Sequence, residues 1–320
     1  MQQQISLIER YRGAMIGVHV GDALGAPYET WPEERILADM QARDGLVLFD
    51  YEDPWGKDGL FPAGCPTDDS ELTAVLAEHL IENPEDLEDL YARFRSCVVD
   101  RKSRLCALPA YGFGGTTRRA LKEPTYREAV QQPNTRPPIP SNGALMRAVP
   151  IPLRFFGSPR QVSDCAYVTS LMTHRHPQAI DASVVYAHLL YGVLEHGNYE
   201  QAVARLVGML PGLTVDQAII DIFHSPAQKP VFEGKFGGGA LHTLCVVHWA
   251  VSTSTSFEEG MTKAITIGSD TDTYGAVAGG LLGATYGVRG IPAKWKHGLL
   301  GGVRMWQLAE KLHALANPAS

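Results

Sequence analysis

The sequence lacks the features of a membrane or secreted protein. No apolar run among its 320 residues is long enough to span a bilayer. The first residues, Met1 to Arg12, are polar, contain Glu9 and have none of the apolar core of a signal peptide. We therefore expect a cytoplasmic protein with no membrane partner.

Cysteine is scarce and scattered. The five cysteines contain no CxxC pair, which excludes the usual sequence patterns of a disulfide framework or a zinc site; they are Cys65, Cys97, Cys106, Cys165 and Cys245. Reduced thiols, as in the cytoplasm, fit this pattern best.

The chain also lacks a concentration of positive charge. Its 28 Lys and Arg residues are outnumbered by 35 Asp and Glu residues, the net charge is -7, and the two signs are mixed along the sequence. Binding to nucleic acid relies on clustered Lys and Arg that neutralise phosphates. We therefore expect no nucleic-acid partner.

The apolar residues follow a helical period. Stripes at spacings of three and four occur in Ile8–Val18, in Leu72–Leu80 and in Ile180–Leu194. His196 and Gly197 follow the third stripe and predict its end. These patterns predict a mostly helical protein.

Other structure is expected in few places. Leu46–Phe49 is the best short candidate for a strand, because strand-like alternation is otherwise scarce. Pro133–Pro140 is rich in proline and is predicted to be a loop. The length of the chain allows one large domain or two.

Glycine recurs at every fourth position in two distant segments, and this spacing places it on one face of a helix. The positions are Gly13, Gly17, Gly21 and Gly25, then Gly275, Gly279, Gly283 and Gly287. Because a glycine inside a helix costs about 0.5–1 kcal/mol relative to alanine, a close approach of two backbones is the expected reason. If the two helices pack together, the acids beside them converge.

Those acids form two clusters, Thr67–Ser70 (TDDS) and Gly268–Thr273 (GSDTDT), with Asp22 and Glu29 elsewhere in the sequence. Each cluster alone is also typical of a helix N-terminus, where acids are favourable. A calcium loop is excluded at the second, because the twelfth position is Leu281 rather than Glu. Together the clusters offer only hard oxygen ligands, which favour Mg²⁺ or Mn²⁺ over zinc.

The order of the motifs resembles the ADP-ribosylglycohydrolase family. The matching stretches are Gly13 to Glu29, Thr67 to Ser70, Ser141 to Pro150 (SNGALMRAVP), Met172 to Pro177 (MTHRHP) and Gly268 to Gly287. The resemblance implies an all-α, single compact domain of orthogonal helices over residues 1–320, with central glycine-rich helices. It also implies two Mg²⁺ ions, or Mn²⁺, held by Thr67, Asp68, Asp69, Asp270, Asp272 and Thr273.

The resemblance further implies a hydrolase that removes ADP-ribose from a modified protein, with arginine-linked ADP-ribose as the expected substrate. Glu29 would be a mobile acid near the reacting ribose, since it stands apart from both clusters in the sequence. Either Glu29 or Asp69 would take the proton from the attacking water.

The remaining motifs are interpreted against that substrate. In Tyr111–Thr117 a glycine-rich turn offers backbone N–H groups to a diphosphate, and Thr116 opens a helix. Asn142–Gly143 would start a helix and border the adenosine pocket, and Arg147 would serve the diphosphate or pair with a core acid. His174 would contact the distal ribose, and His176 is structural. The substrate-binding candidates are therefore Gly112, Gly114, Gly115, Thr116, Asn142, Gly143 and His174.

One departure from the family weakens the arginine assignment. Members that activate dinitrogenase reductase carry an acid just before the glycine of the phosphate loop, whereas Tyr111 precedes Gly112 here. Two alternatives stay open. One is an immunity-type protein that blocks or reverses an ADP-ribosylating toxin, and the other is a hydrolase of O-linked, nucleic-acid-linked or free ADP-ribose derivatives. We expect a monomer.

Overall fold

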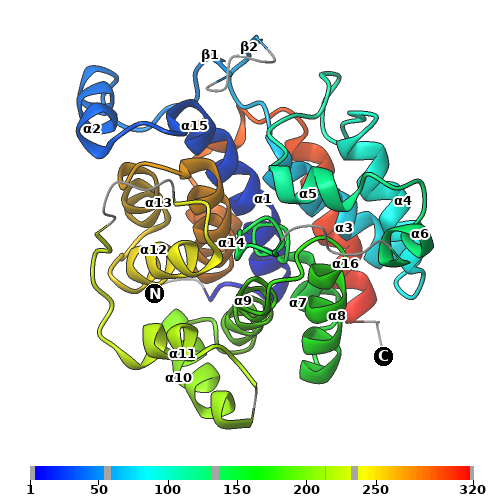
Figure 1. Cartoon of the computed structure of the whole chain (residues 1–320). Helices are drawn as coiled ribbons and strands as arrows, with labels where there is room; N and C mark the ends of the chain where they lie inside the picture. Colours follow the sequence, from blue (N-terminus) through cyan, green and yellow to red (C-terminus); the bar gives the residue numbers. More distant parts are fainter. Residues whose placement is uncertain (1–3, 54–58, 132–136, 213, 232–236, 318–320) are drawn as a thin grey trace.

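The computed structural model describes residues 4–53, 59–131, 137–212, 214–231 and 237–317. These residues are mostly helical, with very little strand (Figure 1). The α-helices are α1 (Leu7–Gly25), α2 (Glu33–Ala42), α3 (Asp68–Glu82), α4 (Leu87–Val98), α5 (Gly115–Ala120), α6 (Tyr126–Gln131), α7 (Pro150–Arg154), α8 (Pro159–Leu171), α9 (Pro177–His196), α10 (Tyr199–Met209), α11 (Gln217–His224), α12 (Ala240–Ser252), α13 (Phe257–Thr266), α14 (Thr271–Gly290), α15 (Ala293–Lys296) and α16 (Gly302–Ala316). Two 3-10 turns, η1 (Ala26–Tyr28) and η2 (Leu210–Gly212), and two short strands, β1 (Tyr51–Glu52) and β2 (Leu60–Phe61), complete them. No helix in these residues is long and apolar enough to cross a membrane.

The centre of the molecule is the antiparallel pair of α1 and α14, which lie side by side in Figure 1. Gly13 faces Gly283, Gly17 faces Gly279 and Gly21 faces Gly275. A methyl group on any of these six glycines would lie 1.9–2.3 Å from a carbonyl oxygen of the other helix, far inside contact distance. The glycine stripes are therefore needed for the backbones to touch, and the predicted central glycine-rich helices are confirmed.

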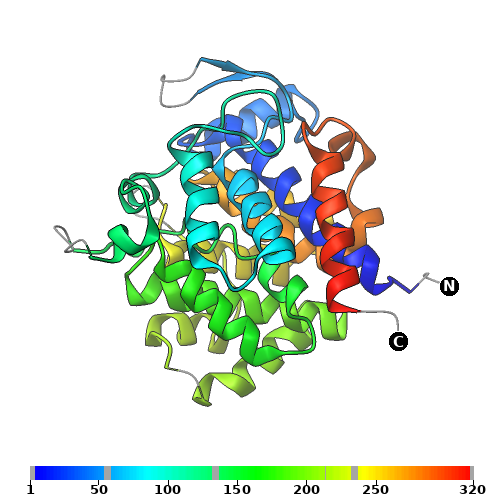
Figure 2. The same cartoon turned by 90° about the vertical axis from the view of Figure 1, so that its right-hand side faces the viewer.

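The other helices surround this pair. The three helices α1, α3 and α16 pack together on one side (Figure 2), while α9, α12 and α13 contact α14. The Tyr186 hydroxyl on α9 donates to the Val277 carbonyl at 2.9 Å, which ties the outer helix to the central one. Because α1 ends where α3 and α14 begin, three helix termini meet at one place.

The helices expected from apolar periodicity are present as α1, α3 and α9. The end of α9 is also confirmed, because Gly197 follows it in the left-handed conformation with a φ of 70°. Glycine adopts that conformation without the clash that a Cβ atom causes. The all-α prediction is therefore correct.

The strand expected at Leu46–Phe49 is wrong, because this segment forms neither a strand nor a helix. The Leu46 carbonyl accepts a hydrogen bond from the Trp295 indole at 3.0 Å, which takes the place of a sheet contact. The two strands lie just beyond, with Tyr51 opposite Phe61. Of the expected loop at Pro133–Pro140, residues 133–136 lie outside the described residues, and 137–140 have no helix or strand.

Candidate metal centre and substrate pocket

The N-terminus of α3 is capped by an acid from α1. Both carboxylate oxygens of Asp22 accept from the Thr67 amide, at 3.0 and 3.2 Å, and Oδ1 accepts from the Thr67 hydroxyl at 2.7 Å. The Ser70 amide donates to the same carboxylate at 3.0 Å. Thr67 is the N-cap residue but makes no side-chain cap of its own. Asp22 therefore satisfies the free amides of the first turn and places the TDDS motif.

Asp69 lies between the two acidic clusters. Its Oδ2 is 3.4 Å from the hydroxyl of Thr67 on one side and 3.4 Å from the hydroxyl of Thr273 on the other. Its Oδ1 is buried and has no hydrogen-bond partner. A buried carboxylate oxygen without a partner is costly unless a proton or a cation satisfies it.

The second cluster opens α14. Asp270 is the N-cap residue, and the Asn142 side-chain amide donates to its Oδ2 at 2.7 Å. Asp272 follows in the first turn, where the Thr273 amide donates to its Oδ1 at 2.8 Å. The sequence interpretation that the glycine helices bring distant acids together is thus correct, since Thr67 links Asp22 to Asp69 and Asp69 in turn contacts Thr273.

Glu29 lies beside this cluster in three dimensions, although it stands apart from both clusters in the sequence. One carboxylate oxygen each from Glu29, Asp270 and Asp272 lies within 4.8 Å of the others. The cause is a pair of backbone hydrogen bonds, from the Thr30 amide to the Ser269 carbonyl at 2.7 Å and from the Ser269 amide to the Trp31 carbonyl at 3.2 Å. These bonds join the segment after η1 to the start of α14.

Burial of so many carboxylates raises their pKa values. Desolvation, only partly offset by the bonds from Thr67 and Ser70, raises the pKa of Asp22 to about 6. Desolvation, with repulsion from Asp22 and Asp270, raises the pKa of Asp68 to about 8. The pKa values of Asp69 and Asp272 are raised well above the ordinary value, mainly by desolvation and then by neighbouring carboxylates. Without a cation, the cluster therefore retains protons near neutral pH.

The residues fit a hard divalent cation. Ligand oxygens around Mg²⁺ lie at about 2.1 Å from the ion, so adjacent ligands are separated by about 3 Å and opposite ones by about 4 Å. One oxygen each from Glu29, Asp270 and Asp272 lies within 4.8 Å of the others, so a single cation can be approached by all three. The unpartnered Oδ1 of Asp69 and the two threonine hydroxyls add further oxygen donors.

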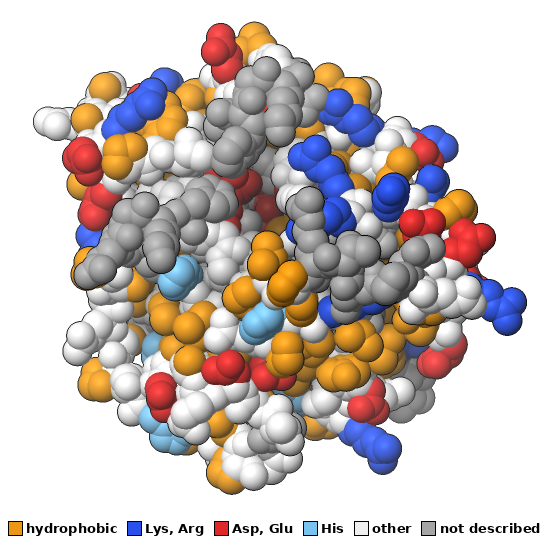
Figure 3. Space-filling model, in the orientation of Figure 1, with side chains coloured by type: hydrophobic (Ala, Val, Ile, Leu, Met, Phe, Trp, Pro, Cys, Tyr) orange, Lys and Arg blue, Asp and Glu red, His pale blue; other side chains and the backbone are white. Residues whose placement is uncertain are grey.

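A pocket of about 540 Å³ opens above the acids. Figure 3 shows acidic side chains deep in a hollow near the middle of this face, with basic side chains on its rim. All site residues expected from the sequence line the pocket except Thr67 and Asp69, which are buried; the lining ones are Glu29, Asp68, Gly112, Gly114, Gly115, Thr116, Asn142, Gly143, His174, Asp270, Asp272 and Thr273. Asp53, Arg118 and Arg119 also line it and were not expected.

The glycine-rich turn lies directly against the acids. Gly112 has a φ of 91°, and a methyl group there would lie 2.6 Å from Oδ1 of Asp68. The Tyr111 ring stacks on Phe61 at 3.7 Å, and its hydroxyl contacts that of Tyr51. Thr116 lies within α5 rather than outside it, so the expected helix start is confirmed.

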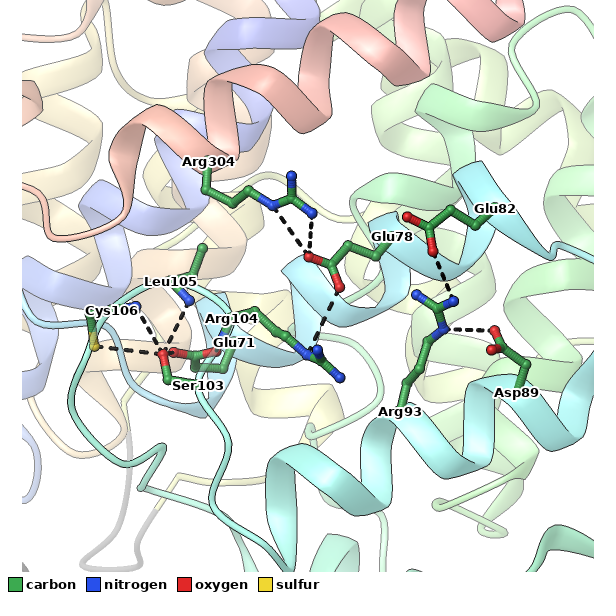
Figure 4. Close-up of polar contacts among 10 residues, drawn as sticks. All are labelled: Glu71, Glu78, Glu82, Asp89, Arg93, Ser103, Arg104, Leu105, Cys106 and Arg304. Atoms are coloured by element: carbon green, nitrogen blue, oxygen red, sulfur yellow. Dashed lines mark hydrogen bonds and ion pairs between the residues drawn. The ribbon is translucent and has the colours of Figure 1, made fainter.

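The loop that precedes the glycine-rich turn, at residues 103–106, is anchored to α3 through Glu71 (Figure 4). Buried Glu71 accepts from the Ser103 hydroxyl and, at 2.7 Å, from the Arg104 amide. Burial raises the pKa of Glu71 to about 7. Two turns further along α3, Glu78 bonds Arg304 of α16 at 2.7 Å. These contacts tie the glycine-rich turn to the helix that carries Asp68 and Asp69.

Two expectations around Asn142 and Arg147 are wrong. No helix starts at Asn142–Gly143, because Ser141 bridges to Gly239 and residues 143–147 form turns up to Pro150. Arg147 does not line the pocket; it is buried and donates to the Gly143 and Thr169 carbonyls and the Thr173 hydroxyl. Its hydrogen bonds therefore go to two backbone carbonyls and a threonine hydroxyl, and not to a diphosphate or a core acid.

The two histidines differ as expected. His174 lines the pocket, with Nδ1 2.8 Å from the Thr173 hydroxyl. Burial lowers its pKa to about 3, which keeps the ring neutral. His176 is structural, since its Nδ1 accepts from the Gln178 amide at the start of α9.

Comparison with known proteins decides the family. The family model for ADP-ribosylglycohydrolase matches residues 3–320. The chain belongs to the ADP-ribosylglycohydrolase family. Members are hydrolases that act on glycosidic bonds of ADP-ribose, so the family and the class of enzyme inferred from the motifs are confirmed.

Relatives of this ADP-ribosylglycohydrolase span nearly the whole chain. ADP-ribosylarginine hydrolase Tri1 of Serratia proteamaculans (strain 568) is 26% identical over 97% of this chain and 80% of its own length. The ADP-ribosyl-[dinitrogen reductase] glycohydrolase of Rhodospirillum rubrum is 26% identical over 91% of this chain and 90% of its own. A solved structure described as an "ADP-ribosylglycohydrolase-related protein complex" matches with a TM-score of 0.75 and 29% identity, covering 97% of this chain and 99% of that one.

Sequence reasoning gave too little weight to Asp22. It was noted only as an acid within the glycine stripe, yet it caps α3 and sits at the junction of three helices. The signal was present, because Asp22 lies between Gly21 and Gly25 on the helix that contacts α14. Arg118 and Arg119 gave no signal beyond their proximity to the glycine-rich turn.

Proposed function

We propose that this ADP-ribosylglycohydrolase hydrolyses the N-glycosidic bond between ADP-ribose and an arginine side chain of a modified protein, with two Mg²⁺ ions, or Mn²⁺, as cofactors. The observation that carries the proposal is the acidic cluster on the floor of the pocket. Its carboxylates come from three helix termini and adjoin a turn suited to a diphosphate. The two relatives named for arginine-linked or dinitrogen reductase-linked ADP-ribose support the substrate class.

The proposed ligands are those implied by the family, namely Thr67, Asp68, Asp69, Asp270, Asp272 and Thr273, and Glu29 lies beside Asp270 and Asp272 without belonging to this set. Bound divalent cations would neutralise the carboxylates and supply Lewis-acid chemistry at the ribose hydroxyls. The buried Asp69 suits a ligand better than a base, because it does not line the pocket.

The wall of the pocket would bind the diphosphate. The amides of Gly112, Gly114 and Gly115 adjoin Arg118 and Arg119 in the lining. Arg118 Nε donates to the Phe113 carbonyl at 2.6 Å, which orients the guanidinium beside the turn. His174, held neutral, would hydrogen-bond a ribose hydroxyl. This binding far from the reacting bond would orient the ribose.

Glu29 would be the base, since it lines the pocket beside Asp270 and Asp272. It takes a proton from a water that attacks the anomeric carbon as positive charge develops on the ribose ring. The bond from carbon to the arginine nitrogen breaks, and the electron pair leaves with the guanidine. The proton held by Glu29 then passes to the guanidine, which leaves as a cation.

The test is release of ADP-ribose from an arginine-ADP-ribosylated protein, measured with EDTA, after readdition of Mg²⁺, and with Asp272→Asn. We expect EDTA to abolish release, Mg²⁺ to restore it, and Asp272→Asn to lower it at least about 100-fold, because removal of one charged ligand weakens cation binding. Asp164→Asn is the matched control, since Asp164 is exposed on α8. Release that survives complete chelation would refute the metal-dependent mechanism.

The same assay separates the alternatives. Turnover of serine-linked or nucleic-acid-linked ADP-ribose in place of the arginine-linked form would assign another linkage. Tight binding of an ADP-ribosylating toxin without turnover would assign the blocking role. The cytoplasmic location and the monomeric state stay predictions.

A further inference from the structure

Asp53 is the one carboxylate among the described lining residues that the proposed mechanism leaves without a role. Among the described residues, five acids line the pocket, and four of them belong to the acidic cluster or lie beside it; the five are Glu29, Asp53, Asp68, Asp270 and Asp272. We propose that Asp53 binds the positively charged guanidinium of the arginine acceptor and thereby sets the preference for arginine-linked ADP-ribose. This inference rests on the proposed function.

The backbone directs Asp53 inward. Side chains alternate between the two faces of an extended strand. Along β1 and the residue after it, Tyr51 is buried, Glu52 is exposed and Asp53 is buried again, with only 8% of its surface exposed. The Asp53 amide donates to the Gly59 carbonyl at 2.9 Å, which continues the pairing of the two strands. Asp53 therefore shares the inner face with Tyr51.

The inner face of the hairpin connects both sides of the reacting centre. Tyr51 and Phe61 pack in one apolar cluster with Tyr111, which precedes Gly112, and with Ala26, which lies one turn before Glu29. The hairpin thus contacts the glycine-rich turn on one side and the segment that carries Glu29 on the other (Figure 1). Asp53 lines the pocket from this position.

The chemistry of the acceptor calls for such a residue. A guanidinium keeps its charge when it is ribosylated, and its planar donors match a carboxylate in charge-assisted hydrogen bonds. The residue before Gly112 offers no acid for this purpose, because the Tyr111 ring is stacked on Phe61. The hairpin supplies the carboxylate instead. An acceptor without charge, such as the oxygen of an O-linked serine, gains nothing from it.

The test compares Asp53→Asn with Glu52→Gln, the matched control on the outer face of the same hairpin. With saturating Mg²⁺, each full-length variant is assayed on arginine-linked and serine-linked ADP-ribosyl peptides, and its affinity for free ADP-ribose is measured by calorimetry. We expect Asp53→Asn to lower kcat/KM on the arginine-linked peptide by roughly 10- to 100-fold, the range for loss of a hydrogen bond to a charged group. Glu52→Gln should stay within about two-fold of the wild type, and Asp53→Glu should recover part of the loss.

ADP-ribose, which has no acceptor, distinguishes recognition from a structural role. Its affinity for Asp53→Asn should stay within about two-fold of wild type, as should any turnover of the serine-linked peptide. The inference would be overturned if Asp53→Asn lowered kcat/KM on the arginine-linked peptide and affinity for ADP-ribose by the same factor. It would also be overturned if Asp53→Asn and Glu52→Gln did not differ on the arginine-linked peptide. A wild-type protein active only on the serine-linked peptide would overturn it too, while leaving the glycohydrolase function intact. A wild-type protein active on neither peptide refutes the proposed function and the inference with it.

Discussion

Substitution of Gly17 by alanine tests whether the site depends on contact between the two central helices. The new methyl carbon would lie 2.0 Å from the Gly279 carbonyl oxygen and 2.8 Å from its carbon. Both belong to helix backbone, so relief requires α1 and α14 to separate by about 1.4 Å, to reach ordinary contact near 3.4 Å. Overpacking of a core costs about 1–3 kcal/mol and sometimes more, and this rigid neighbour places Gly17→Ala at the upper end.

Alanine also favours a helix over glycine by about 0.5–1 kcal/mol, which offsets part of that cost. The expected net loss is about 2 kcal/mol, or a decrease in Tm of about 3 °C for a chain of this size. Asp22 lies little more than one turn beyond Gly17, so the same separation should also weaken Mg²⁺ binding.

Gly208→Ala is the matched control, because Gly208 lies in α10 and a methyl group there meets no atom within 4 Å. This variant should be unchanged or more stable by up to about 1 kcal/mol. The assays are thermal and urea unfolding followed by circular dichroism, together with Mg²⁺ titration. If Gly17→Ala is as stable as Gly208→Ala, the argument that close backbone contact requires these glycines is wrong.

Three further predictions follow from the site. The pKa values of Asp22 and Asp68 are raised to about 6 and about 8, so the folded state binds protons more tightly than the unfolded state. The stability of the metal-free protein should therefore fall as pH rises from about 4 to 8, and the gain in Tm from Mg²⁺ should be larger at pH 8 than at pH 5.5. An equal gain at the two pH values would contradict the argument that Mg²⁺ displaces these protons. Glu29→Gln should lower single-turnover rates at least about 100-fold and change ADP-ribose affinity less than about three-fold at saturating Mg²⁺, and a rate within a few-fold of wild type would remove Glu29 from the mechanism. Gly112→Ala should lower stability by about 1–2 kcal/mol and should also lower Mg²⁺ affinity, since the φ of Gly112 is 91° and the new methyl group would lie 2.6 Å from Asp68. Unfolding measures the first effect and calorimetry the second. A fully stable variant with normal Mg²⁺ affinity would count against this close approach.

The sequence interpretation succeeded where the pattern itself is the physical cause. Apolar residues at helical spacing found α1, α3 and α9, because each helix must bury one face. It failed at Leu46–Phe49 because the alternation there serves burial of Leu46 and a hydrogen bond from Trp295, 249 residues away in sequence. It failed at Asn142 because the chain there is held by distant segments: the Asn142 backbone amide donates to the Gly238 carbonyl and its side-chain amide to Asp270.

By itself, the sequence predicted a mostly helical protein, two helices each with a face of glycine suited to close packing, and the oxygen-rich character of the site, since these follow from residue type and period. Tertiary structure alone decided that Asp22 caps α3, that Glu29 joins Asp270 and Asp272, and that Arg147 lies outside the pocket. It also placed Asp53, Arg118 and Arg119 in the pocket wall. The reason is that a helix period specifies which residues share a face, whereas the partner of that face depends on how helix ends meet. Here they meet through hydrogen bonds between segments more than 200 residues apart, such as that from Thr30 to Ser269.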